Sequence, residues 1–370
     1  MSRIVQLANF VGPRSGGLRT TLTHLARGYA AAGHEVVHIV PGGQPAVHVT
    51  EWGRRVVLRG LPLPGTGYRV VVAREQVERV VHELRPDRLE VHDRLTFHGV
   101  AAATGVPALV ISHERLDRVL AQWVPVHGRL LAAVADRRNT ALARGHEQVV
   151  CTTAWAGEEF TRLGLPVTRV PLGVDLGRFR PPAGTTVRDR LSEDGAALLV
   201  LASRLSREKR PALAIDTVAE LVRRGRRVQL VIAGDGPLWR ALEARAAGLP
   251  VRFLGFVAEP ERLAGVLAAA DVALAPGPVE TFGLAALEAL ASGTPVVADA
   301  GSALPELLGA AGGLAVPGRP GEFADAVEAV LDAPNRFEPR ARAERFPWSA
   351  TVAGFLLAHR LPAPPMTVPG

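Results

Sequence analysis

The fold is decided by the stretch Asp271-Val-Ala-Leu-Ala275-Pro-Gly-Pro-Val-Glu280-Thr-Phe282-Gly283-Leu284-Ala-Ala-Leu-Glu288. Its first five residues predict a buried strand, and an amphipathic helix is predicted over Phe282–Ala291. A strand that leads through a short loop into a helix is one β/α unit of a parallel sheet. Because the same rhythm extends in both directions along the chain, the stretch indicates an α/β protein.

Two glutamates make this stretch a candidate ligand-binding site. Glu280 lies at the end of the loop, Glu288 lies two turns into the helix, and Gly283 lies near the helix start. A helix N-terminus suits an anion, and glycine lets a phosphate approach the backbone. Carboxylates beside that phosphate would accept hydrogen bonds from hydroxyls on either side of it, which describes a nucleotide sugar. The alternative is a buried strand followed by a helix with solvated glutamates.

The chain is organised in two halves that repeat this architecture. The Gly- and Pro-punctuated segment Val170–Pro182 separates them and is predicted to be the hinge. We expect two doubly wound parallel-sheet domains, residues 1–171 and 172–347, with the helix over 348–360 packing back on the first. Strands are predicted at Ile4–Ala8, Val36–Val40, Leu89–Val91, Ala108–Ser112, Gln148–Cys151, Ala197–Ala202, Val228–Ala233, Val251–Leu254, Val272–Ala275 and Pro295–Ala298, and first-half helices at Gly17–Ala31, Val70–Leu84 and Leu130–Leu142.

Composition agrees with an intracellular two-domain protein. The 370 residues are 48% hydrophobic, which is enough for two sizeable cores. Cys151 is the only cysteine, which excludes an internal disulfide and suits a reducing compartment. No apolar run reaches 18 residues and the chain opens directly on a predicted strand, so neither a signal peptide nor a membrane span is predicted. The expected location is the cytoplasm.

The charge balance favours phosphate-bearing partners. The formal net charge is +7, which suits nucleotides or anionic lipid, whereas sparse aromatics and the lack of a long basic run argue against nucleic acid. Lys209 is the only lysine among 43 lysines and arginines. Either this position needs a compact ammonium, or the lysine survives by chance in an arginine-biased composition.

Further candidates follow other predicted strands, where parallel sheets bind ligands. Gly16 and Gly17 precede the first helix and suit an anion, although an ordinary glycine-rich turn is the alternative. His113 suits a sugar hydroxyl or a leaving phosphate, or is a capping histidine, and His92 is a weaker candidate of the same kind. Arg204, five residues before Lys209, would reach the same anion, unless both belong to a solvated basic turn.

Several function classes are disfavoured by missing motifs. The dinucleotide fingerprint Gly-x-Gly-x-x-Gly is absent, which argues against a nicotinamide dehydrogenase. No Asp-x-Asp stands in a strand-end loop and no His/Cys cluster has ligand spacing, so no metal site is predicted. Gly-x-Ser-x-Gly is also absent, and with it the nucleophile elbow of a hydrolase.

Together these residues resemble the retaining glycosyltransferases of family 4, which have the GT-B fold of two Rossmann-like domains around a cleft. The resemblance spans roughly residues 3 to 360. Its parts occur in the family's order: Gly16-Gly17, His113, Val-Pro-Leu-Gly-Val-Asp175, Ser-Arg204 with Lys209, Gly234-Asp-Gly-Pro, Phe-Leu-Gly255-Phe-Val257, and Glu280 with Glu288.

The resemblance implies a role for each of these positions. The first domain would bind the acceptor and the second the donor, with the lobes closing on binding. Retention by front-face attack is expected, with the departing phosphate taking the acceptor's proton and with no covalent nucleophile, metal or cofactor. The expected contacts are Arg204 and Lys209 to the diphosphate, Glu280 to the hexose, backbone N–H groups of Phe282, Gly283 and Leu284 to sugar and phosphate, Glu288 to the ribose, Gly255, Phe256 and Val257 to the base, Gly16 and Gly17 to the phosphates, and His113 to the sugar.

Three segments are similar in sequence to actinobacterial mannosyltransferases that build phosphatidylinositol mannosides: Asn9–Thr20, Ile111–Asp117 and Ala275–Glu288. This similarity implies GDP-mannose as donor and a glycolipid acceptor at the inner face of the plasma membrane. A basic stretch would then contact anionic lipid, unless it is a solvated face: Arg54, Arg55, Arg59, Arg69, Arg74 and Arg79.

Three alternatives stay open at the level of sequence. The first is a family 4 enzyme with a UDP-sugar and a soluble acceptor, such as a small glycoside or a polysaccharide precursor. The second is a catalytically inactive nucleotide- or phospholipid-binding protein. The third, a sugar epimerase, is disfavoured by the spacing of Glu280 and Glu288. The base and the linkage position are not predicted, because they depend on backbone contacts and on residues 41–70 and 115–130.

Overall fold

The computed structural model describes residues 1–12, 16–63, 68–118, 128–181, 184, 186–192 and 195–363. The chain divides into two domains, Met1–Leu172 together with the chain from Trp348 on, and Gly173–Pro347. The division after Leu172 lies one residue beyond the expected boundary. The final helix, α15 (Trp348–Ala358), belongs to the first domain.

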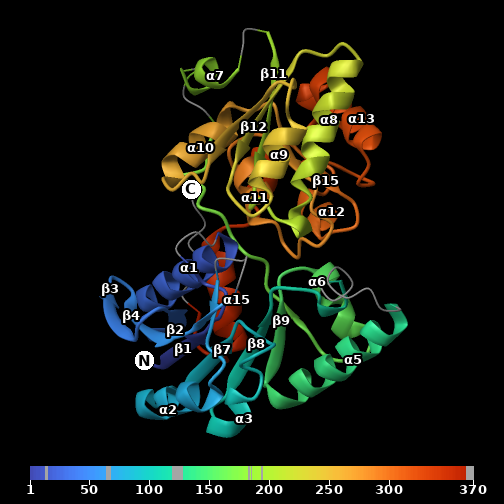
Figure 1. Cartoon of the computed structure of the whole chain (residues 1–370). Coiled ribbons are helices and arrows are strands. Elements are labelled where there is room, and N and C mark those ends of the chain that lie inside the picture. The colour runs from blue at the N-terminus through green and yellow to red at the C-terminus, as the bar shows by residue number, and fades with distance from the viewer. Residues whose placement is uncertain are drawn as a thin grey trace. The chain divides into compact units, whose positions relative to one another are not determined.

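The first domain contains an eight-stranded sheet (Figure 1). Its order is β10-β9-β8-β7-β1-β2-β4-β3, and all neighbours are parallel except the antiparallel pair β3 and β4. The order reverses between β1 and β7, which makes this pair the topological switch point. The strands are β1 (Arg3–Leu7), β2 (Glu35–Gly42), β3 (Ala46–Thr50), β4 (Gly53–Arg59), β7 (Arg88–Val91), β8 (Ala108–Ser112), β9 (Gln148–Cys151) and β10 (Thr168–Arg169).

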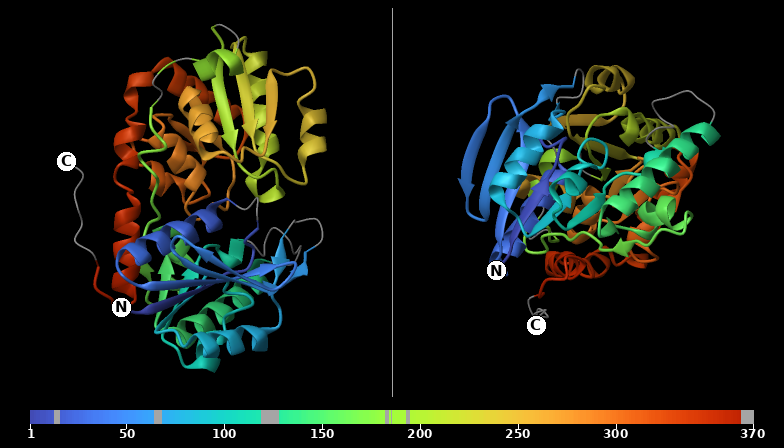
Figure 2. Two further views of the ribbon diagram at one scale, coloured as in Figure 1. Left: turned by 90° about the vertical axis from the view of Figure 1, so that its left-hand side faces the viewer. Right: turned by 90° about the horizontal axis from the view of Figure 1, so that it is seen from below.

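Helices cover both faces of this sheet. Apolar residues of α1 (Gly17–Ala31) and α15 pack on one face, around Ile4 and Ile111. Figure 2 shows α15 in red beside α1 in blue, and the rings of His24 and Trp348 stack at 4.4 Å. The other face is covered by α2 (Arg74–Leu84), α3 (Val100–Thr104), α5 (Gly128–Gly145) and α6 (Ala154–Thr161).

The second domain contains a six-stranded, fully parallel sheet in the order β13-β12-β11-β14-β15-β16, with its switch point between β11 and β14. The strands are β11 (Ala197–Ala202), β12 (Val228–Ala233), β13 (Val251–Gly255), β14 (Val272–Ala275), β15 (Val296–Asp299) and β16 (Gly313–Val316). The predicted architecture of two doubly wound parallel sheets is therefore confirmed.

Helices also flank this second sheet. Residues of α8 (Pro211–Arg223), α9 (Trp239–Arg245) and α13 (Pro320–Asp332) form one core with the strands. On the other face, α10 (Pro260–Ala269) and α11 (Leu284–Ala291) pack against β11, β14 and β15. The remaining elements are short: α7 (Thr186–Leu191), η1 (Arg207–Lys209), α12 (Leu304–Leu308), η2 (Pro334–Arg336) and α14 (Pro339–Ala343).

Three helix starts differ from the prediction: the helix predicted from Leu130 begins at Gly128, and two others begin later than predicted. The helix predicted from Val70 begins at Arg74, because Val70 pairs in the short strand β6 (Arg69–Val70) with β5 (Leu61–Pro62). The backbone N–H of Val71 also donates to Asn9 Oδ1 at 2.9 Å. The helix predicted from Phe282 begins at Leu284, because Gly283 adopts a left-handed conformation.

The hairpin of β3 and β4 and the edge strand β16 were not predicted. The strand β3 is short, and His48 separates its two valines, so it lacks the continuous apolar run by which the buried strands were predicted. Consecutive glycines open β16, which weakens its strand signal. None of the described helices is both long and apolar enough to span a bilayer.

Candidate functional site

The predicted donor residues gather at the carboxyl edge of the second sheet. Four neighbouring strands end there, in the order β13, β12, β11 and β14. Their loops carry Gly255–Val257, the Gly234-Asp-Gly turn, the segment with Arg204 and Lys209, and Glu280. The middle of this row is the switch point between β11 and β14, where open α/β sheets bind ligands.

Lys209 and Glu280 form an ion pair across the switch point. The ammonium of Lys209, at the end of η1, donates to Oε1 of Glu280. Both side chains are partly accessible, at 30% and 22%. Gly277 brings the loops together, since a Cβ there would lie 3.3 Å from the backbone oxygen of Glu208. The pair places one compensated carboxylate and one cation beside each other at a solvent-accessible edge.

The glycines of the Gly234-Asp-Gly turn explain how Arg204 is positioned. A Cβ at Gly234 would lie 1.8 Å from the carbonyl oxygen of Ser203, and one at Gly236 would lie 2.5 Å from that of Leu205. The N–H of Leu205 also donates to the carbonyl oxygen of Asp235 at 3.0 Å. Only glycine permits this approach, so the loop that carries Arg204 is fixed against the next loop along the sheet.

Gly283 shapes the start of α11. It has φ +89° and ψ 60°, and a Cβ on it would lie 2.3 Å from Leu304 Cδ2. Phe282 is buried and meets the ring of Phe346 edge-on at 6.1 Å. This packing holds the backbone of residues 282–284 in place, and the first turn of α11 offers N–H groups that lack intrahelical partners. The arrangement suits an anion, as the sequence predicted.

Glu288 lies in the second turn of α11, eight residues after Glu280, and is half-buried. Burial raises the pKa of Glu288 to about 8, although the charge of Arg178 opposes the shift. The carboxyl is therefore mostly protonated at neutral pH in the ligand-free domain. A group that donates two hydrogen bonds, such as a ribose diol, would favour its ionised form.

Gly255 ends the edge strand β13, and Phe256 and Val257 follow it directly. Gly255 has φ +74°, which turns the chain sharply at the strand end. The side chain of Phe256 is 40% exposed beside this turn. An exposed aromatic ring at the outer end of the row is compatible with the predicted contact to a base.

Gly16 and Gly17 lie at the switch point of the first domain, after β1 and at the start of α1. Residues 13–15 of the same predicted loop lie outside the described residues. Among the described atoms, a Cβ on Gly16 would meet nothing within 4 Å. Packing against these described atoms therefore does not require glycine at position 16.

His113 follows β8 and contacts His92, which follows the neighbouring strand β7. His92 Nδ1 lies 2.8 Å from His113 Nε2, and the two rings are nearly parallel, with an interplanar angle of 16° and centroids 5.1 Å apart. Burial first, and the neighbouring His92 second, lower the pKa of His113 to about 3, so the ring is neutral at physiological pH. Two histidines that the sequence presented separately thus form one unit.

Glu90 is a buried residue of this region that sequence reasoning missed. It lies on β7 beside Gln6 of β1 and is fully inaccessible. Burial alone would raise the pKa of Glu90, but hydrogen bonds from His359 and His92 outweigh it and hold the pKa well below its ordinary value. A charged residue between Leu89 and Val91 in a predicted buried strand was the available signal.

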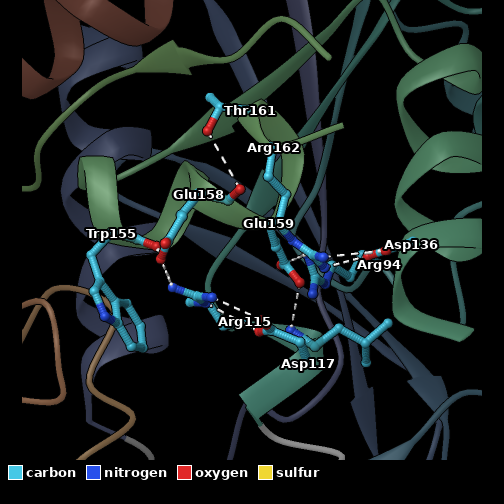
Figure 3. Close-up of polar contacts among 10 residues, drawn as sticks. Arg94, Arg115, Asp117, Asp136, Trp155, Glu158, Glu159, Thr161 and Arg162 are labelled. Carbon is cyan, nitrogen blue, oxygen red and sulfur yellow. Dashed lines mark hydrogen bonds and ion pairs between the residues drawn. The ribbon is translucent and has the colours of Figure 1, made fainter. Parts of the chain in front are cut away.

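The loop after β8 is fixed by a group of ion pairs (Figure 3). Arg115 donates to both carboxylate oxygens of Asp117, at 3.1 and 2.8 Å, and also pairs with Glu158. Its guanidinium lies over the Trp155 ring, 4.6 Å from the centroid. The N–H of Leu116 donates to Glu159 Oε2 at 3.0 Å. These contacts attach residues 115–117 to α6 and so fix the position of the segment that follows His113.

Two further observations concern metal binding and the basic stretch. Within the described residues, no three histidine, cysteine, aspartate or glutamate side chains form a group that could hold a metal ion. In the basic stretch, Arg54 pairs with Glu35 and Arg74 pairs with Glu78. These two positions therefore carry internally compensated charge.

Known proteins resemble this chain over nearly its whole length. Two family models match the chain: one described as "Glycosyltransferase Family 4" over residues 15–178, and one described as "Glycosyl transferases group 1" over residues 196–333. A relative from Mycobacterium tuberculosis is 46% identical over 364 residues, which cover 96% of this chain and 95% of the relative. That protein is named GDP-mannose-dependent alpha-(1-6)-phosphatidylinositol dimannoside mannosyltransferase.

Solved structures share the architecture over nearly the whole chain. Sucrose-phosphate synthase from Thermosynechococcus elongatus has a TM-score of 0.79 at 21% identity and covers 97% of this chain and 98% of its own. Anabaena HepE in complex with UDP-glucose has a TM-score of 0.76 at 18% identity and covers 97% and 100%. Likeness at this level of identity establishes the fold alone, and it confirms the predicted GT-B fold.

Proposed function

Because the chain belongs to glycosyltransferase family 4, we propose that it transfers mannose from GDP-mannose to a hydroxyl of a phosphatidylinositol mannoside, with retention of configuration. As a glycosyltransferase, the protein uses an activated sugar donor and an acceptor that bears a hydroxyl. The name of the mycobacterial relative, which matches over nearly both full lengths, supports this choice of donor and acceptor.

The observation that carries the proposal is the arrangement at the switch point of the second sheet. The Lys209–Glu280 pair lies after neighbouring strands, and the turn through Gly283 leads into the first turn of α11. Cations and helix N–H groups stabilise a diphosphate, and a carboxylate accepts from sugar hydroxyls. A diphosphate that joins a hexose to a nucleoside requires these groups side by side.

The proposed roles follow from this arrangement. Arg204 and Lys209 neutralise the charge that develops on the leaving diphosphate, which lets the reaction proceed without a metal ion or cofactor. Glu280 orients the hexose while its own charge is balanced by Lys209. Backbone groups of Phe282, Gly283 and Leu284 contact sugar and phosphate, Glu288 the ribose, and Gly255, Phe256 and Val257 the base. In the first domain, Gly16 and Gly17 lie beside the phosphates and His113 beside the sugar.

The acceptor side of the proposal concerns the first domain. A glycolipid acceptor implies that the protein works at an anionic membrane surface, which we place at the inner face of the plasma membrane. The positive net charge of +7 favours such a surface. Arg59 and Arg79 are the members of the basic stretch to test first, because Arg54 and Arg74 already have carboxylate partners.

The test begins with calorimetric binding of GDP, UDP and ADP to the full chain without added metal. A preference for GDP is expected and leads to a transfer assay with GDP-mannose and phosphatidylinositol mannosides, with the anomeric configuration read by NMR. A preference for UDP would refute the mannosyl proposal and favour a soluble acceptor. Nucleotide binding without transfer to any acceptor would favour an inactive binding protein. Transfer that survives unchanged in Glu280→Ala and Lys209→Ala would refute the proposed roles of these residues.

A further inference from the structure

The carboxylate of Asp299 is buried at the carboxyl edge of the second sheet and accepts from two donors. Asp299 is the last residue of β15, and only 7% of its side chain is exposed. Its Oδ2 accepts from Nη1 of Arg210 at 3.1 Å, and its Oδ1 accepts from the N–H of Gly301 at 2.8 Å. Because a buried carboxylate needs a compensating partner, this ion pair attaches the loop after β15 to the segment that contains Arg210.

Arg210 directly follows Lys209 and forms the junction between η1 and α8. Its backbone is left-handed, with φ +47° and ψ 47°. This conformation is unfavourable for a residue with a Cβ, and it persists where surrounding contacts impose it. The side chain supplies such contacts, because Nη2 also donates to the carbonyl oxygen of Gly318 at 2.8 Å. The pair with Asp299 therefore stabilises the turn that begins directly after Lys209.

Gly318 shows how closely the pair is enclosed. A Cβ at this position would lie 2.2 Å from Oδ2 of Asp299 and 2.3 Å from Nη1 of Arg210. A larger residue would push the two charged groups apart, so the glycine leaves the space that the ion pair occupies.

The turn after Asp299 also holds the carboxylate partner of Lys209. Oγ of Ser302 donates to the carbonyl oxygen of Asp299 at 2.7 Å, which closes the turn. The N–H of the next residue, Ala303, donates to the carbonyl oxygen of Glu280 at 2.9 Å. The side chain of Glu280 in turn accepts from the ammonium of Lys209. Asp299 is therefore linked to Glu280 through this turn, and to Lys209 through the arginine that follows it.

We infer that Asp299 is a positioning residue of the proposed donor site: through Arg210 it sets where the ammonium of Lys209 meets Glu280. This inference rests on the proposed function and deepens it, because that ammonium would neutralise the leaving diphosphate. A charge stabilises a leaving group best when its position is fixed before the ligand binds. Asp299 acts on the donor through Lys209 and makes no contact of its own with it.

Replacement of Asp299 by asparagine should loosen this arrangement while keeping the size of the side chain. An amide has one acceptor oxygen, whereas the carboxylate accepts from both Arg210 and Gly301. In either orientation the amide NH2 therefore faces one of these donors. The change also removes the negative charge beside the guanidinium.

A matched control lies at the opposite edge of the same sheet. Asp271 directly precedes β14 and pairs with Arg188, whose two Nη atoms donate at 2.9 and 2.7 Å. Its Oδ2 also accepts from the N–H of Leu198 at 2.7 Å. Asp271→Asn thus removes the same kinds of contact in the same domain, at the edge away from the proposed site.

The first experiment uses the fact that Lys209 is the only lysine of the chain. Full-length protein labelled with 13C-lysine is studied without ligand at pH 7, where a lysine ordinarily carries its charge, and its single 1H–13C signal for Cε needs no assignment. Glu280→Gln gives the position of this signal without the ion pair. Asp299→Asn and Arg210→Met should each move the signal toward that position, and Asp271→Asn should leave it in place. No movement in Asp299→Asn, or equal movement in the control, overturns the inference.

The experiment stays decisive if Asp299→Asn does not fold. Gly318→Ala keeps both charges and separates them through its Cβ, so it should move the lysine signal in the same direction. A signal that does not move in Gly318→Ala contradicts the inference. A signal that Glu280→Gln leaves in place also contradicts it, because Lys209 would then lack the partner toward which Asp299 directs it.

The second experiment measures the dissociation constant of GDP by calorimetry. Asp299→Asn is expected to raise this constant about threefold, as for a weakened rather than a lost contact, and Asp271→Asn should leave it unchanged. In a Lys209→Met background, Asp299→Asn should have no further effect, because the carboxylate acts through the ammonium. An equal effect in both backgrounds, or in the control, overturns the inference, since it shows a general role in the fold.

The two experiments separate failure of this inference from failure of the proposed function. Wild-type protein that binds no GDP refutes the proposed donor. The lysine signal is measured without ligand, so it still decides whether Asp299 positions Lys209 against Glu280.

Discussion

Donor binding is predicted to strengthen with pH because of Glu288. Burial raises the pKa of this carboxyl to about 8 in the free domain. Both oxygens of the ionised form accept hydrogen bonds from a ribose diol, whereas one oxygen of the protonated form carries a donor hydrogen, so the diol favours the ionised form. About one tenth of the carboxyl is ionised at pH 7 and about nine tenths at pH 9. The dissociation constant of GDP should therefore fall about tenfold over this interval, which corresponds to ~1.4 kcal/mol.

The assay is isothermal titration of GDP at pH 7, 8 and 9, with Glu288→Gln as the matched control. This window lies above the titration of the terminal phosphate, whose second pKa is about 6. At pH 7 the wild type should release about 0.9 proton per nucleotide, seen as a dependence of the heat on buffer ionisation, and at pH 9 about 0.1. Glu288→Gln should bind more weakly at pH 9 and show a nearly flat profile. A flat wild-type profile, or the same slope in the variant, would refute the reasoning.

The same shift predicts a change in the stability of the ligand-free protein. The carboxyl has an ordinary pKa of 4.5, and its folded-state pKa is raised to about 8. Between these values the folded state holds a proton that the unfolded chain releases, so the free energy of unfolding falls as pH rises through this window. Denaturant titrations of Glu288→Gln should lack this part of the fall. A steeper fall in the variant than in the wild type would contradict the assignment.

Three further predictions concern other contacts of the second domain. Lys209→Met should raise the dissociation constant of GDP about tenfold, because it leaves Glu280 uncompensated beside the diphosphate, and adding Glu280→Gln should recover part of the loss in the same titration. Gly234→Ala should cost about 1–3 kcal/mol of unfolding free energy, because its Cβ would lie 1.8 Å from a backbone oxygen, whereas Gly321→Ala, with open space around it, should be neutral or stabilising in the same urea titration. Arg340→Met should lower the free energy of unfolding by about 2–3 kcal/mol in the same titration, because the guanidinium donates to three backbone carbonyls. A loss of less than about 0.5 kcal/mol, which is half the contribution of one hydrogen bond, would contradict this account.

The parallel strands were predictable because they are buried on both faces. Such strands appear as continuous apolar runs, and Ala108–Ser112, Val228–Ala233 and Val272–Ala275 have the predicted bounds. The hairpin of β3 and β4 was not predictable in the same way, since its edge strand lacks a continuous apolar run. The helix expected from Val70 was too long because a distant side chain, Asn9, takes the N–H of Val71. Such a tertiary contact has no local sequence signal.

The grouping of the candidate residues was predictable as far as strand ends determine it. The rule that ligands bind beyond the carboxyl ends of parallel strands selected Lys209, Glu280 and Gly283, and the structure brings these together in one domain. That Lys209 bonds Glu280, 71 residues away, followed only from the order of the strands. The environment of Glu90 was beyond sequence reasoning, because its partner His359 is 269 residues away.

The two glutamates of the proposed donor site have opposite states in the ligand-free domain. Glu280 has a cationic partner before any ligand arrives, so the sugar end of the site is organised in the free domain. For Glu288 the charge of Arg178 opposes the effect of burial without outweighing it, and we expect its proton to leave if a ribose binds there. A protonated Glu288 also removes one negative charge from the proposed site, which favours the approach of a diphosphate. Replacement of Glu280 should therefore remove an ion pair of the free protein, whereas replacement of Glu288 should act mainly through the pH dependence of stability and of binding.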